Sequence, residues 1–187
     1  LSSYRITETA KALQEFVDEL SNWYVRRSRE RFWGKDMTQD KINAYMTLYT
    51  ALSTFIKLAA PMIPFVTDVI YQNLVRNSYT DAKESVHLCD FPVVDETYID
   101  RELEKNMELV LEIVTLGRAA RNTANIKNRQ PVGQMFVKAP FILNDFYKAI
   151  VADELNIKAV EFKDDMEEYL SYSFKPQFKV LGPKAGR

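Results

Sequence analysis

The sequence predicts a mainly α protein, a bundle of about four to five helices followed by a small α/β subdomain. Three observations lead to this prediction. Only 5 of the 187 residues are glycine, while 47% are hydrophobic and 27% charged, and this composition favours long helices over turn-rich β architecture. Apolar residues recur at helical spacing as far as residue 124. After Gln130 and Pro131 the pattern becomes that of strands, so we expect domains at residues 1–130 and 131–187.

Four helices are expected in the first part because apolar residues recur there at positions i, i+3, i+4 and i+7. The first covers residues 6–32, and the second begins near Thr38 or Asp40, either of which can cap a helix. Pro61 and Pro64 end or bend the second helix. A third helix follows at about residues 65–76, a surface connection at 77–95 and a fourth helix at about 96–124.

The second part alternates between the two kinds of pattern. Met135–Val137 is typical of a strand, residues 142–154 of a helix, and residues 158–162 of a strand with alternating faces. One or two further strand candidates lie at residues 169–174 and 178–181. The sequence therefore predicts a strand-helix-strand-strand subdomain.

Several classes of site are excluded by what the chain contains. Cys89 and His87 are the single cysteine and the single histidine, too few for a disulfide framework or for a zinc site built from Cys and His. No phosphate-binding glycine loop or serine-centred turn is present, so we expect no catalytic residue and no metal. No apolar run approaches the roughly 20 residues of a membrane span, so we expect a soluble chain without a membrane partner. Because residue 1 is leucine and no signal region follows, we expect a piece of a longer protein.

Charge is distributed unevenly along the chain. The net charge of −1 argues at first sight against a nucleic-acid partner. Residues 22–35, 117–131 and 170–187, however, each carry +4, whereas residues 90–108 and 153–168 each carry −5. The near-neutral total is an average over opposed segments, and the basic segments are candidate binding surfaces.

The end of the first helix is the first candidate. On a straight helix of about 100° per residue, Asn22, Arg26, Arg29 and Trp33 share a sector opposite the apolar stripe. Guanidinium groups suit phosphates, and a tryptophan or arginine plane can stack on an unpaired base. The alternative is a solvated helix end in which Arg27 and Arg31 pair with acidic neighbours and Trp33 packs in the core.

The end of the fourth helix is the second candidate. Arg118, Arg121, Asn122 and Asn125 share a face at i, i+3, i+4 and i+7, and Lys127, Asn128 and Arg129 follow. Cations near a helix C-terminus are favourable in any protein, which explains one or two of these charges. Asparagine amides can also read base edges, so nucleic-acid binding and a purely structural role both stay open here.

These residues carry a resemblance to a known family. The run from Leu20 to Trp33, LSNWYVRRSRERFW, strongly resembles a helix-end signature of isoleucyl-tRNA synthetases, in the anticodon-binding domain that follows the catalytic core. Other stretches follow in the family's order and cover nearly the whole chain: Leu48–Leu52, Ala60–Phe65, Ser85–Leu88, Gly117–Arg121, Ile126–Pro131, Asp153–Asn156 and Leu181–Lys184. Val132 and Arg187 depart conservatively from the usual leucine and lysine. The His-x-Gly-His and Lys-Met-Ser-Lys-Ser elements of class I synthetases are absent from the sequence.

The resemblance implies a fragment that binds the anticodon arm of an isoleucine tRNA and has no catalytic site or cofactor of its own. Bases would contact Trp33, Asn122, Asn125 and Asn128, and phosphates the basic residues Arg26, Arg29, Arg118, Arg121, Lys127 and Arg129. For the parent, an ATP-dependent ligase, it implies ATP and Mg in a catalytic core of the same polypeptide and a cytoplasmic location. The alternatives are a helical protein–protein interaction module, or the same domain of a valyl, leucyl or methionyl synthetase.

Overall fold

The computed structural model describes residues 4–169 and confirms a mainly α fold with a small α/β part. The chain forms two compact units, unit 1 (Leu1–Asp95) and unit 2 (Glu96–Arg187). The division at residues 130 and 131, which follows the change of sequence pattern, stays a prediction. Among the described residues, no helix is both long and apolar enough to cross a membrane.

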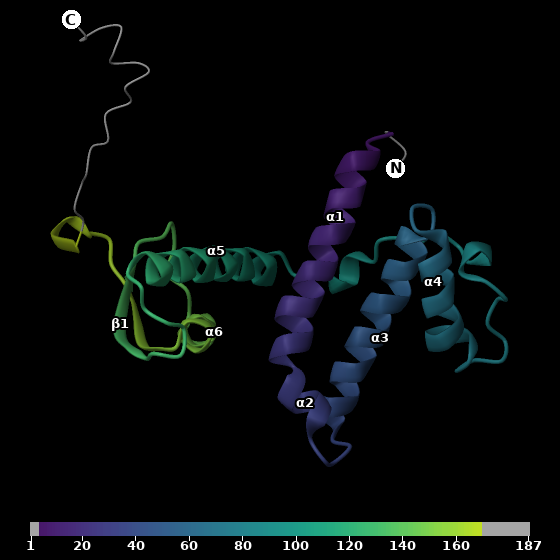
Figure 1. The fold of residues 1–187 in the computed structure, drawn as a ribbon, viewed down its shortest axis with the longest axis horizontal. Helices are drawn as coiled ribbons and strands as arrows, with labels where there is room; N and C mark the ends of the chain where they lie inside the picture. Colours follow the sequence, from purple (N-terminus) through teal and green to yellow (C-terminus); the bar gives the residue numbers. More distant parts are fainter. Residues whose placement is uncertain (1–3, 170–187) are drawn as a thin grey trace, which may run out of the picture. The chain divides into compact units, whose positions relative to one another are not determined.

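Unit 1 is built from helices close to those predicted. Helix α1 covers Ile6–Glu19 and continues as a π-helical segment, η1, at Leu20–Val25, before a short helix α2 at Arg29–Trp33. Helices α3 (Gln39–Ala59) and α4 (Pro64–Tyr71) follow, and α4 continues as the π-helical segment η2 (Gln72–Arg76). Helices α1 and α3 lie side by side and run in opposite directions, with α2 at the turn between them (Figure 1).

Local chemistry explains where the unit 1 helices begin and end. The Thr38 hydroxyl accepts a hydrogen bond from the Lys41 N–H (3.2 Å), which confirms Thr38 as the cap of α3. Helix α3 ends at Ala59, two residues before Pro61, and Pro64 is the first residue of α4, where its missing N–H is not needed. The predicted stops at the two prolines are therefore confirmed.

The core of unit 1 joins α3, α4 and the connection that follows α4. Ile56, Ala60, Tyr71 and Val86 form a buried apolar cluster, and Phe16 of α1 stacks on Phe55 of α3 at 5.5 Å between ring centroids. The connection at 77–95 contains only a short 3-10 turn, η3 (Val86–Leu88). Asp68 of α4 holds this turn by accepting hydrogen bonds from the Ser85 hydroxyl (2.7 Å) and the Val86 N–H (2.9 Å). These bonds lower the pKa of the Asp68 carboxyl.

Unit 2 consists of a long helix, a shorter helix and two strands. After a 3-10 turn, η4 (Glu96–Tyr98), helix α5 covers Arg101–Thr123, strand β1 Val132–Val137, helix α6 Asp145–Leu155 and strand β2 Ile157–Phe162. The strands pair in parallel, from Val132 opposite Ile157 to Val137 opposite Phe162, with α6 as the crossover. Both strands and α6 are thus confirmed to within three residues. Tyr169 ends the 3-10 turn η5 (Glu167–Tyr169), and the other strand candidates at 170–174 and 178–181 lie outside the described residues.

Helix α5 begins five residues later than predicted because Asp100 is its cap. The Asp100 carboxylate accepts hydrogen bonds from the N–H groups of Glu102 (3.1 Å) and Leu103 (3.0 Å). The buried residues of α5 follow helical spacing along one side: Leu109, Val110, Ile113, Val114, Gly117 and Arg121. Helix α6 packs on this helix and buries Tyr147, Val151 and Leu155 (Figure 1).

Gly117 permits the close packing of α6 on α5. A Cβ atom at this position would lie 2.4 Å from Cδ1 and 3.2 Å from Cδ2 of Leu155, which is itself only 1% exposed. A larger residue would therefore force a buried side chain to move. The missing side chain of Gly117 is what lets the end of α6 reach this part of α5.

We expect Gly117→Ala to destabilise the chain by up to about 2 kcal/mol, since the overpacking cost of about 1–3 kcal/mol is offset only in part by the helix-propensity gain of about 1 kcal/mol. Urea unfolding followed by circular dichroism measures this. In a Leu155→Ala background the obstacle is gone, and Gly117→Ala should be neutral or stabilising. A Gly117→Ala variant that is more stable than the natural chain would contradict the packing argument.

Candidate nucleic-acid interface

Of the three basic segments, residues 170–187 lie outside the described residues. The two candidate segments that the structure describes lie on different units, and nearly all of the predicted site residues in them are exposed. Residues 22–33 belong to unit 1 and residues 118–129 to unit 2. Exposed in the structure are Asn22, Arg26, Arg29, Trp33, Arg118, Asn122, Asn125, Lys127, Asn128 and Arg129. Arg121 is the exception among the predicted residues, since it is buried at 5% exposure.

The first segment is not one straight helix, and the prediction of a single helical row through residue 33 is wrong. The π-helical turns of Leu20–Val25 and the turn at the buried Ser28 change the angle per residue. Instead the structure forms two arginine–tryptophan pairs. The guanidinium of Arg26 lies 5.9 Å from the Trp23 ring, and that of Arg29 lies 5.1 Å from the Trp33 ring.

For this segment, the position of Trp33 favours the binding interpretation and that of Arg31 the structural one. Trp33 is 75% exposed, so it does not pack in the core as the structural alternative required. Arg31, in contrast, donates two hydrogen bonds of 2.7 Å to the carboxylate of Asp40, as that alternative expected. The exposed aromatic surface is therefore available for a ligand, whereas Arg31 serves to hold α2.

Helix α2 is fixed to α3 by contacts around this ion pair. The Tyr24 hydroxyl donates to the Ala44 carbonyl (2.9 Å), and the Tyr45 hydroxyl donates to the Phe32 carbonyl (3.3 Å). The rings of Phe32 and Tyr45 are in contact, with 5.0 Å between centroids. On the other side of Trp33, the Gly34 carbonyl accepts a hydrogen bond from Nζ of Lys41 (2.6 Å). Because both neighbours of Trp33 are held by α3, the indole lies on a fixed support rather than on a free end.

In the second segment, α5 ends in a Schellman motif. The Asn125 N–H donates to the Asn122 carbonyl (3.1 Å), and the Ile126 N–H donates to the Arg121 carbonyl (2.9 Å). Asn125 has a φ of 59°, the left-handed conformation that such an ending requires. Asn125 therefore lies beyond the helix and does not continue its face, although its side chain is exposed.

The side chains of Arg118 and Arg121 differ in burial and in hydrogen-bond partners, although the two residues are three positions apart on α5. Arg118 donates to the carboxylate of Glu154 on α6 (2.8 Å), whose side chain is 1% exposed. Arg121 points inward, and its Nη2 donates to the carbonyl of Lys127 (2.6 Å) and to that of Gln130. Arg121 has the helical spacing predicted with Arg118 and Asn122, but it is buried where they are exposed, because its side chain holds the loop that follows the helix.

We call residues 127–130 the basic loop. Its two middle carbonyls, those of Asn128 and Arg129, accept hydrogen bonds from Nδ2 of Asn156 (3.3 and 3.0 Å). Asn156 ends α6 with a φ of 51°, and its own carbonyl accepts from the Val132 N–H (3.0 Å). Asn156 is not among the predicted site residues. Its place directly after α6, where asparagine favours the left-handed conformation, is the local signal that could have drawn attention to it.

Metal ligation has no support in the described part of the chain. Across residues 4–169, no three or more His, Cys, Asp or Glu side chains gather where they could hold an ion. What both segments offer is guanidinium, ammonium, amide and indole groups, the side chains that bind phosphates and unpaired bases.

A helical domain that exposes such groups on two segments has the surface chemistry of a protein that binds single-stranded RNA. The family model described as the anticodon-binding domain of tRNA ligase matches residues 1–137. The chain belongs to this family. The predicted family membership is thereby confirmed.

Among known proteins, the chain is similar along its whole length to several called isoleucine--tRNA ligase. It is 54% identical to that of Clostridium novyi and 52% identical to that of Clostridium acetobutylicum, each over 187 residues. Identity to that of Thermus thermophilus is 44% over 192 aligned positions. In each case the match covers 100% of this chain but 18% of the relative, so the chain spans about a fifth of the length of these proteins.

We expect Arg31→Ala to raise the pKa of Asp40. The two hydrogen bonds from Arg31 lower this pKa below its ordinary value. Since the pKa is lower in the folded chain, the contribution to stability is present above the unfolded value of about 3.9 and is lost as pH falls through the folded value. An NMR titration of side-chain carboxyl groups measures the change. Arg5→Ala, remote from Asp40 on unit 1, should leave the titration of Asp40 unaltered. An equal shift of the Asp40 pKa in both variants would refute the assignment.

Proposed function

We propose that this chain binds the anticodon arm of an isoleucine tRNA. Membership of the anticodon-binding family supports an RNA ligand, and the relatives named isoleucine--tRNA ligase, at 44–54% identity over the whole chain, support this particular tRNA. The alternative of a helical module that binds a protein partner is not favoured, because the family model matches across both candidate segments. The valyl, leucyl and methionyl alternatives lack support among these relatives.

The observation that carries the proposal is the basic loop with its neighbours. Residues 117–131 contain four basic residues and no acidic one, and Lys127, Asn128 and Arg129 all expose their side chains. Cations bind the phosphates, and the asparagine amide forms hydrogen bonds with base edges of an unpaired loop. On unit 1, Trp33 supplies an exposed aromatic face on which an unpaired base stacks.

We infer further that the chain works as part of a longer ligase. In that protein, ATP and Mg²⁺ activate isoleucine in a catalytic core outside these 187 residues, and this domain contacts that core. We expect the protein in the cytoplasm, where translation takes place. The isolated chain should bind RNA weakly, since it holds only one arm of the tRNA, and the binding should weaken with salt.

We expect Arg129→Glu to weaken binding of the isoleucine anticodon stem-loop by roughly tenfold at low salt, and Arg129→Ala to reduce the salt slope by about one. Fluorescence anisotropy of a labelled stem-loop measures both. Arg129 is preferable to Arg118 as the target, because a carboxylate at position 118 would meet the buried Glu154 and disturb the fold.

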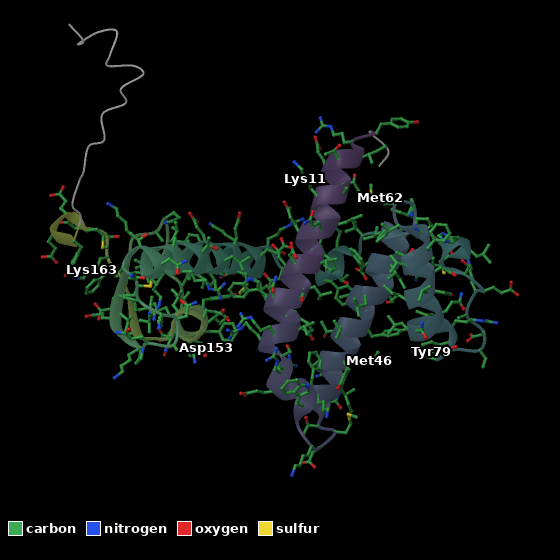
Figure 2. All side chains as sticks on the ribbon, viewed as in Figure 1. Lys11, Met46, Met62, Tyr79, Asp153 and Lys163 are labelled. Atoms are coloured by element: carbon green, nitrogen blue, oxygen red, sulfur yellow. The ribbon has the colours of Figure 1, made fainter. Side chains whose placement is uncertain are left out.

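Lys11→Glu provides the matched control. Lys11 is an exposed lysine of α1 that points away from α3 (Figure 2), and the substitution makes the same change of charge outside both segments. Its affinity should be close to that of the natural chain. If Lys11→Glu and Arg129→Glu weaken binding equally, attraction by net charge explains the result. If stem-loops with changed anticodons bind as well as the isoleucine one, recognition of the anticodon is refuted.

Trp33→Ala tests the aromatic contact. Base–aromatic stacking contributes about 1–3 kcal/mol, so we expect the affinity to fall by about 5- to 150-fold, while Trp33→Phe retains most of it. The chain contains 2 tryptophans, so Trp33 is the sole tryptophan in a Trp23→Phe variant, and selective excitation of the indole follows this residue alone. Its emission should be quenched when the stem-loop is added. Unchanged emission and affinity would remove Trp33 from the interface.

A further inference from the structure

The backbone carbonyls of the basic loop are all occupied from within the protein. Arg121 donates to the carbonyls of Lys127 and Gln130, the first and last residues of the loop. Asn156 donates to those of Asn128 and Arg129, the two residues between them. Two side chains from the ends of two different helices thus hold four consecutive carbonyl groups.

This arrangement has an electrostatic consequence for any ligand of the loop. Carbonyl oxygens carry partial negative charge, so a phosphate is repelled wherever they face it and attracted wherever cationic side chains face it. The loop carbonyls are turned toward protein donors, while the side chains of Lys127, Asn128 and Arg129 are exposed. The loop therefore presents cations and an amide toward solvent and its carbonyls toward the protein.

We infer that Arg121 and Asn156 are positioning residues that hold the basic loop in the form that binds RNA. This inference rests on the proposed function and adds to it two residues that need not touch the ligand. We call Arg121 and Asn156 together the bracket. Because of the bracket, Lys127 and Arg129 are already oriented in the free protein. Binding of RNA therefore does not lose conformational entropy of the loop.

The burial of Arg121 indicates a role other than stabilising the helix end. Within residues 4–169, its buried Nε and Nη1 atoms have no hydrogen-bond partner and it forms no ion pair. A buried, incompletely paired guanidinium is unfavourable for folding. The Schellman bonds of Asn125 and Ile126 already end α5 without this side chain. Arg121 adds the two hydrogen bonds that hold the loop, and it places a positive charge beneath the loop.

The bracket depends on the packing of α6 on α5. Gly117 admits Leu155, and the residues adjacent to them, Arg118 after Gly117 and Glu154 before Leu155, form an ion pair. One residue beyond Leu155, Asn156 reaches the loop, and one turn beyond Gly117, Arg121 does the same. The stretches Gly117–Arg121, Ile126–Pro131 and Asp153–Asn156, which are separate in the sequence, are thus joined by contacts in unit 2.

Asn156→Gly is the sharpest test, because glycine accepts the φ of 51° and only the amide is lost. We expect binding of the isoleucine anticodon stem-loop to weaken by about tenfold and the salt slope to fall by about one, as if a phosphate contact of the loop were missing. Arg121→Lys, which keeps the charge on a shorter side chain, is the second variant and should act in the same direction.

Asn144→Ala is the matched control for stability. Asn144 caps α6 by accepting from the Tyr147 N–H (3.3 Å), so its loss destabilises unit 2 without touching the basic loop. We expect this variant to lower the melting temperature while leaving RNA affinity unchanged. If it weakens binding as much as Asn156→Gly does, stability alone explains the effect and the bracket is refuted.

A double-mutant cycle decides whether the bracket acts through the loop. In a chain that carries Lys127→Ala and Arg129→Ala, Asn156→Gly should change affinity by less than about twofold, because the side chains that it positions are gone. An undiminished effect in that background would overturn the inference. If the loop variants weaken binding but Asn156→Gly and Arg121→Lys do not, the bracket fails and the proposed function stands. If the natural chain binds no stem-loop, both fail.

Discussion

The packing of Leu155 against Gly117 is the contact on which the arrangement of the second segment depends. A glycine in the middle of α5 weakens the helix by about 1 kcal/mol relative to alanine, so its presence needs a reason from packing. That reason is the end of α6, where Leu155 occupies the space that a side chain would take. The approach then brings Glu154 to Arg118 and Asn156 to the basic loop. One absent side chain thus sets the position of several polar groups.

The basic residues of this chain serve different purposes, and the charge of a segment does not distinguish them. Arg31 holds α2 to Asp40, and Arg118 joins α5 to α6 through Glu154. Arg121 is buried under the loop. Among the residues singled out, Lys127 and Arg129 present charge to solvent from a loop whose backbone is held by other groups. A count of cations therefore overstates the number of phosphate contacts, and it leaves out the residues that orient them.

Much of the fold could be predicted because it follows from local patterns. Apolar spacing located α3, α4 and the two strands, and Thr38 and the prolines set helix limits that the structure confirms. Two features could not be predicted in this way. The π-helical turns at Leu20–Val25 break the regular period that the spacing argument assumes. The role of Asn156 depends on contacts with residues 27 and 28 positions away, which no local pattern encodes. Arg121 turns inward to carbonyls 6 and 9 positions further along, in a loop that has no periodic pattern.

The same contacts couple the stability of unit 2 to the shape of its binding surface. A loop that is ordered only when RNA binds loses conformational entropy at that step and binds less tightly for it. Here the ordering takes place on folding, through hydrogen bonds from Arg121 and Asn156, and the incompletely paired guanidinium is the unfavourable part of that arrangement. A more stable core would put an apolar side chain at position 121. Such a replacement would release the loop carbonyls at both ends, so the residue that best stabilises the fold and the residue that best presents the loop are not the same.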